Sequence, residues 1–184
     1  MKSDYSFESF GKQDYKLGFI QEHVEMIAYC LVCFFVPFFI GHPQQVVGVA
    51  VNAALVLAAL NLKSVKVLPV IILPSLAVLS RGVIFGPFTY FLVLMIPFIW
   101  LGNTILVYAF KRFAVDQKMN KVLALVIGAA AKTAFLFSAA FVLFKIGALP
   151  AIFLTTMGLF QLYTALAGGA LALGIHTIKK KLQI

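Results

Sequence analysis

Long apolar stretches fill the chain between residues 24 and 175, and short segments rich in polar residues separate them. The stretches contain runs of Leu, Ala, Val and Phe without strict alternation of apolar and polar positions, which favours helices over the strands of a membrane barrel. A helix needs about 20 mostly apolar residues to cross a bilayer. The pattern therefore predicts an all-α polytopic membrane protein, a six-transmembrane-helix bundle in one domain, with spans at 24–40, 45–60, 67–80, 88–110, 122–144 and 151–175.

The third predicted span and the segment after it are the least regular parts of the pattern. Residues 67–80 are short for a crossing, so this span either extends into residues 61–66 or does not cross cleanly. The following segment, 81–88, contains Gly82, Gly86 and Pro87, which indicates irregular backbone. It forms either a re-entrant loop that closes over a cavity or a tight exterior turn, and the sequence leaves both open.

Basic residues are distributed unevenly along the chain, whose composition is 62% hydrophobic and 11% charged with a net charge of +9. Apart from Arg81, Lys132 and Lys145, they precede the first span, follow the last span or occupy alternate loops. Since positive residues stay cytoplasmic, we expect both termini inside the cell. The charge thus indicates a multi-pass membrane protein, not a partner of nucleic acid, and we expect it in a bacterial plasma membrane. Residues 1–22 lack the apolar core of a signal peptide and are expected to lie in the cytoplasm or at the membrane interface.

Lys132 is the most informative polar residue because it lies deep in the fifth predicted span. It follows Lys121 by eleven positions, which places it about 16 Å into the membrane. A charge at this depth is costly and normally has a partner. All six acidic residues lie at or before Glu25 or at Asp116, so no carboxylate is available within the bilayer. The pattern predicts a lysine that is neutral, a lysine solvated by neighbouring polar groups, or a lysine that binds an anionic or carbonyl-bearing small molecule.

Amide side chains share the depth of Lys132 in three other spans. These residues are Asn52, Asn103 and Gln161. Amides in a membrane bundle either join helices by hydrogen bonds or read the donors and acceptors of a ligand. With Lys132, and with Arg81, Tyr90 and Trp100 from the outer side, they are predicted to form a mostly apolar substrate-binding pocket with a few convergent polar groups.

Small residues recur at four-residue spacing in the second and sixth predicted spans. The second span carries Ala50, Ala54 and Ala58, and the sixth carries Ala165 and Gly169. Such faces let helix backbones approach closely. They predict either packing within the bundle or a docking face for a second membrane subunit.

The remaining polar residues offer no catalytic or metal-binding constellation. The sequence contains no phosphate-binding glycine loop, no paired carboxylates within the spans and no Ser/His/Asp set on one side. Cys30 and Cys33 lack a second pair that would complete a thiolate metal site. His42 and His176 are expected in loops without a functional role. We therefore expect neither an enzyme nor a cofactor, and a transport function would need an energy source in a partner.

The layout and two segments resemble the substrate-binding S components of energy-coupling factor transporters. One segment reads Leu-Phe-Gln-Leu-Tyr-Thr-Ala-Leu-Ala-Gly-Gly over 159–169, and the other runs from Leu73-Pro74-Ser75 through Phe85-Gly86-Pro87-Phe88 to 97–103. The resemblance implies a protein that captures a vitamin, a vitamin precursor or a trace nutrient from outside. It also implies a transmembrane coupling subunit and ATPase subunits as partners. Family members often dock through small residues four apart on the first helix, which this chain lacks there.

Two functions therefore follow from the sequence. The first is a substrate-capture subunit of such a transporter, and the second is a structural or assembly subunit of a larger membrane complex that binds no ligand. The identity of a substrate is not encoded in any motif.

Overall fold

Six helices of the protein are long and apolar enough to cross a membrane. A computed structural model describes residues 8–40, 43–81 and 89–182, and these six helices occupy Phe19–Ile40, Gln44–Asn61, Ser64–Arg81, Tyr90–Asp116, Lys121–Lys145 and Ile152–Leu182. The described residues form no strand. The prediction of an all-α, six-helix membrane bundle is thereby confirmed.

Several of the six crossings consist of more than one helical segment. In chain order, the elements are η1 (Ser9–Gly11), α2 (Phe19–Phe35), η2 (Val36–Ile40), α3 (Gln44–Asn61), η3 (Ser64–Val67), α4 (Leu68–Arg81), α5 (Thr89–Ala109), η5 (Phe110–Asp116), α6 (Lys121–Lys145), α7 (Ile152–Met157) and α8 (Leu159–Leu182). The η2 and η5 segments are π-helical. Pro37 lies in η2, where its missing N–H disturbs regular α-helical pairing.

The structure corrects two predicted boundaries and favours the extended alternative for the third span. The first span begins at Phe19, before the predicted residue 24, because the mixed polar segment ahead of it already joins the helix. The short third span is lengthened by η3, so that Ser64–Arg81 forms an 18-residue crossing. The sixth span is interrupted at Gly158 and continues to Leu182, beyond the predicted residue 175.

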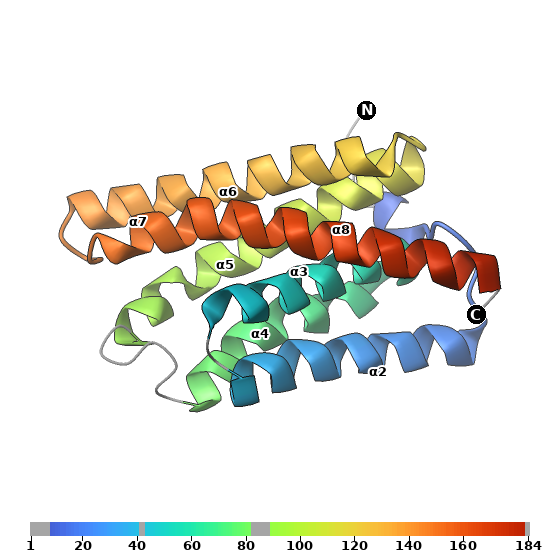
Figure 1. Cartoon of the computed structure of the whole chain (residues 1–184), viewed down its shortest axis with the longest axis horizontal. Helices are drawn as coiled ribbons and strands as arrows, with labels where there is room; N and C mark the ends of the chain where they lie inside the picture. Colours follow the sequence, from blue (N-terminus) through green and yellow to red (C-terminus); the bar gives the residue numbers. More distant parts are fainter. Residues whose placement is uncertain (1–7, 41–42, 82–88, 183–184) are drawn as a thin grey trace.

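The centre of the bundle is α3, which packs against α2, α4, α5 and α8 (Figure 1). Its most extensive contact is with α8, where glycine permits a close approach of the two backbones. A Cβ atom on Gly168 would lie 2.4 Å from the carbonyl oxygen of Val49 and 2.9 Å from the backbone nitrogen of Ala53. The α3–α8 pair is therefore held together by backbone proximity.

The bundle has two chemically different ends. One end, called the lysine-rich end below, contains the start of α2, the end of α3, the η5 segment, the start of α6 and the end of α8, and lies to the right in Figure 1. The N-terminal residues 9–18, called the strap below, fold onto this end, where Asp14 N donates to Leu60 O over 2.9 Å. The opposite end contains the starts of α3, α5 and α8, together with α7. The strap and the end of α8 thus lie at the same end.

Candidate functional site

A cavity of about 120 Å³ lies among the helices in the half of the bundle near the opposite end. Its walls come from α3, α4, α5, α6, α7 and α8, with Pro37 added from η2. Four of the residues predicted to bind substrate line this cavity, namely Lys132, Asn52, Asn103 and Gln161. These residues are far apart in the sequence, and they were grouped by their predicted depth in the membrane. A role in binding a ligand stays a prediction.

Lys132 is buried in the wall of this cavity, with only 2% of its surface exposed. Its Nζ donates a hydrogen bond to Asn52 Oδ1 over 2.6 Å. Within the described ranges, no carboxylate forms an ion pair with this lysine. An ammonium group has three N–H donors, so one neutral amide oxygen leaves much of its hydrogen-bonding capacity for another molecule.

The amide of Asn52 is fixed in orientation by its other contacts. Its Nδ2 donates to Gly48 O over 2.9 Å and to Thr164 Oγ1 over 3.3 Å. Thr164 donates its own hydroxyl hydrogen to Phe160 O over 2.7 Å, so its oxygen accepts from the amide. Asn52 must therefore present its oxygen to Lys132. Both of its N–H groups are in use, which makes it a positioning residue for Lys132 more than a donor to a ligand.

The start of α8 forms a second wall of the cavity. Phe160 and Gln161 in the first turn of α8, and Met157 at the end of α7, all line it. Backbone N–H groups in a first turn have no partner within the helix, and the helix dipole gives this end a positive partial charge. Gly158 precedes the turn and has no side chain that could cap it. The cavity is thus lined by a buried lysine, by the first turn of α8 and by the last residues of α7.

Asn103 contributes an amide from α5 on a further side of the cavity. It is 2% exposed, and its Nδ2 donates to Ile71 O over 3.2 Å. The remaining wall is largely apolar and includes Val51, Leu92 and Ile99. Such a lining, with a few placed polar groups, is typical of small-molecule sites.

Three residues predicted for the outer side do not line the cavity. Arg81 donates to Phe38 O over 2.7 Å at the exposed end of α4, and Tyr90 is 75% exposed on the bundle surface. Trp100 packs against the α3 core, and its buried Nε1 has no hydrogen-bond partner among the described residues. The predicted closing loop, 81–88, falls outside the described residues beyond Arg81.

The small residues predicted to dock a partner are mostly buried inside the chain. Ala54, Ala58 and Ala165 are at most 3% exposed, Gly169 is buried against Leu125, and Ala50 is half-buried. They serve the packing of α3, α6 and α8, so they present no free face to a second subunit. Docking through them would require α3 and α8 to separate.

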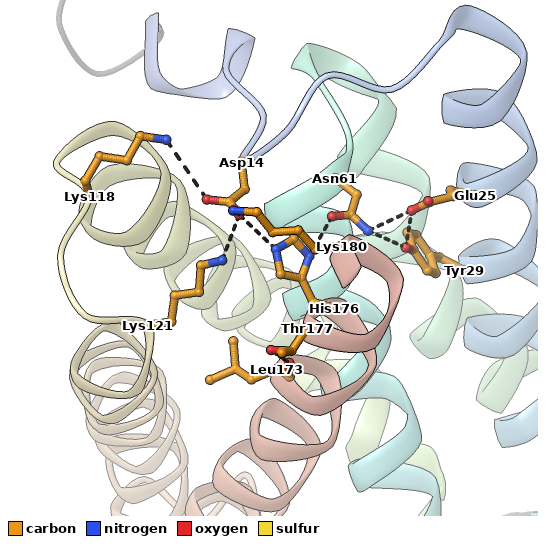
Figure 2. Close-up of polar contacts among 10 residues, drawn as sticks. All are labelled: Asp14, Glu25, Tyr29, Asn61, Lys118, Lys121, Leu173, His176, Thr177 and Lys180. Atoms are coloured by element: carbon orange, nitrogen blue, oxygen red, sulfur yellow. Dashed lines mark hydrogen bonds and ion pairs between the residues drawn. The ribbon is translucent and has the colours of Figure 1, made fainter. Parts of the chain in front are cut away.

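A second buried polar region lies at the lysine-rich end and corrects the placement of His176. Figure 2 shows a chain of contacts that runs from the strap through α8 and α3 to α2, formed by Asp14, His176, Asn61 and Glu25. His176 lies in α8, 1% exposed, with Nε2 2.8 Å from Asp14 Oδ2 and Nδ1 3.1 Å from Asn61 Oδ1. Ala165, Ala172 and His176 recur at a spacing of seven and four residues, which places them on one helix face. This spacing is the sequence signal that could have assigned His176 to a buried helix position.

Acidic partners satisfy the basic groups of this second region. Lys121 donates to Asp14 over 2.7 Å, and Lys179 pairs with Glu25. The hydrogen bond from His176, together with the Lys121 ammonium, holds the pKa of the Asp14 carboxyl well below its ordinary value. These contacts tie the strap to the helices.

Lys111 in η5 is fully buried at the same end but is held by backbone. Its Nζ donates to Lys12 O in the strap over 2.6 Å and to Leu62 O directly after α3. Carbonyl oxygens at a helix C-terminus carry negative partial charge. The chain therefore supplies two backbone acceptors for the three N–H donors of this lysine, against one acceptor for Lys132.

Comparison with protein-family models, with curated proteins and with solved structures finds no match for this chain.

Proposed function

We propose that the protein is a membrane-embedded substrate-capture subunit of a transporter, similar in role to the S components of energy-coupling factor systems. It binds a small nutrient from outside the cell, and a separate coupling subunit with ATPase subunits drives uptake. The observation that carries this proposal is the cavity beside Lys132, where four polar side chains from four helices converge on space that the chain does not fill.

The distribution of charge supports an outward-facing cavity. Lysines at the end that carries the strap favour a cytoplasmic position for that end, by the positive-inside rule. The cavity includes Gln44 and Gln45 at the start of α3 and lies toward the opposite end. A ligand would therefore enter from outside. The absence of a phosphate-binding loop in the sequence supports an energy source in partner subunits.

Native mass spectrometry of the gently extracted protein tests this proposal. We expect a retained small molecule in the wild-type spectrum and its loss in the Lys132→Met variant. Lys145→Met is the matched control, because Lys145 ends the same helix, is exposed and lies outside the cavity. Retention of the ligand by Lys132→Met would contradict the proposal. Stoichiometric protein partners without any small molecule would favour the structural or assembly subunit instead.

A further inference from the structure

We infer that the cavity binds a small organic monocarboxylate, whose carboxylate lies between Lys132 Nζ and the first turn of α8 and whose apolar part contacts the remaining wall. This ligand class rests on the proposed capture function and narrows it, since the sequence left both anionic and carbonyl-bearing ligands open.

The charges around the cavity select an anion over a neutral carbonyl. Lys132 has one neutral acceptor, Asn52 Oδ1, and the contacts that orient Asn52 hold that acceptor in place. The first turn of α8 lines the same cavity at Phe160 and Gln161, beside the last residues of α7. A neutral carbonyl would accept hydrogen bonds from Lys132 but would leave a protonated ammonium without a counter-charge in a region of low dielectric. An anion supplies both the hydrogen-bond acceptor and the counter-charge.

The number of charges selects a monoanion. Lys132 is the one basic side chain among the residues that line the described cavity, and no arginine joins it. Phosphate groups are usually recognised by more than one charged donor or by bidentate arginine. A single lysine with a helix N-terminus fits the charge of one carboxylate.

The size and the walls of the cavity limit the rest of the ligand. A volume of about 120 Å³ is slightly smaller than the dry cavity of about 150 Å³ that admits benzene in an engineered protein. The part of the ligand held inside this cavity therefore has roughly six non-hydrogen atoms. Its non-carboxylate part meets Val51, Leu92 and Ile99, which favours an aliphatic or otherwise apolar group.

Butyrate and butyramide form a matched pair of probes, because they have the same shape and differ in charge. Calorimetric titration of the protein in phosphatidylcholine nanodiscs is expected to show butyrate binding at least about tenfold more tightly than butyramide, through the charge-assisted contact with Lys132. In Lys132→Met this ratio should fall to about one, since the cation is removed while apolar contacts remain. Lys145→Met should keep the wild-type ratio.

Asn52→Asp provides a second variant with a different physical effect. The substitution places a carboxylate within the 2.6 Å contact that Asn52 makes with Lys132, so the chain would supply its own counter-charge. We expect this variant to lose butyrate binding, with Lys132 still present. Undiminished butyrate affinity in a folded Asn52→Asp protein would overturn the proposed site.

The outcomes separate this inference from the proposed function. Equal affinities for butyrate and butyramide, or tighter binding of butyramide, would overturn the anionic ligand but leave a capture function. If neither probe binds and the native mass spectrum shows a retained neutral molecule, the anionic ligand is again overturned and the capture function is left. Binding of neither probe with no retained molecule would overturn both.

Discussion

Lys111 at the lysine-rich end and Lys132 in the cavity are both buried, yet the polar groups around the two ammonium groups differ. Lys111 donates to two carbonyl oxygens, one of which follows the C-terminus of α3. Lys132 has one amide oxygen as its acceptor and lies on the same cavity as the N-terminus of α8. One ammonium therefore donates to backbone oxygens, one of them at the negative end of a helix, and the other donates to a single side-chain oxygen beside a cavity.

The difference distinguishes a structural lysine from a lysine whose remaining N–H donors are available to another molecule. Around Lys111, the chain supplies two carbonyl acceptors by bringing the strap, α3 and η5 together. Around Lys132, it fixes the position of the ammonium through Asn52 but supplies no counter-charge among the described residues. Burial alone is thus a poor indicator of function, and the set of acceptors around a buried lysine is a better one.

The largest effect is expected from Gly168→Val, which tests whether the α3–α8 contact holds the cavity. The new side chain would meet backbone atoms of Val49 and Ala53, which cannot yield without separating the helices. We expect a loss of about 3 kcal/mol or more in stability, seen as a lower thermal midpoint in detergent, and loss of ligand binding. Gly174→Val is the control, because a Cβ at Gly174 meets nothing within 4 Å. Similar midpoints for the two variants would contradict this packing.

The next prediction applies the same substitution to each of the two buried lysines and compares the loss of stability. Lys111→Met leaves two buried carbonyls without a donor and should cost about 2–3 kcal/mol. Lys132→Met replaces a cation without a counter-charge by an apolar side chain of similar length, and its stability should stay within about 1 kcal/mol of the wild type. Thermal unfolding of both variants measures the contrast. Equal destabilisation would show that Lys132 is as structural as Lys111.

A smaller effect is expected at the strap when Asp14 is neutralised. The folded-state pKa of Asp14 is lowered, so its stabilising contribution is complete above its ordinary pKa of 3.8 and is lost as the pH falls below that value. Asp14→Asn should cost about 1–2 kcal/mol near neutral pH. Its difference from the wild type should shrink as the pH falls from about pH 4 to about pH 2, as followed by thermal unfolding. A constant difference over that range would contradict the ion-pair role of Asp14.

The smallest effect concerns the support of Lys132 by Thr164. Thr164→Val removes an acceptor of the Asn52 amide and should weaken ligand binding about threefold, with about 0.5–1 kcal/mol of lost stability. Thr177→Val is a matched control on the same helix, because Thr177 Oγ1 makes the same kind of bond to Leu173 O over 2.8 Å at the lysine-rich end (Figure 2). Equal ligand affinity in both variants would remove Thr164 from the binding machinery.

The sequence predicted the spans and the depth of Lys132 because both depend on order along one helix. Hydropathy counts residues along the chain, and a helical rise converts the distance from Lys121 into depth. The interruption at Gly158 was not visible, since residues 151–175 contain no proline and no charged residue that would mark a break. The break depends on packing against neighbouring helices, and a hydropathy pattern carries no such information.

The composition of the cavity wall was predictable only in part. Asn52, Asn103 and Gln161 were found because amides are rare within spans. Tyr90 and Trp100 were wrongly grouped with them, since depth alone does not give the rotation of a helix about its axis. The bond between Asn52 and Lys132 joins residues 80 positions apart, and only the fold reveals that Asn52 orients the lysine.

A high-resolution structure of the protein purified from its own membrane tests the central claim most directly. We expect density from a small molecule within hydrogen-bonding distance of Lys132 Nζ, on the side facing the first turn of α8, with Asn52 Oδ1 still in contact. A cavity that holds no such molecule, with Lys132 turned to carbonyl acceptors of its own chain as Lys111 is, would contradict the claim.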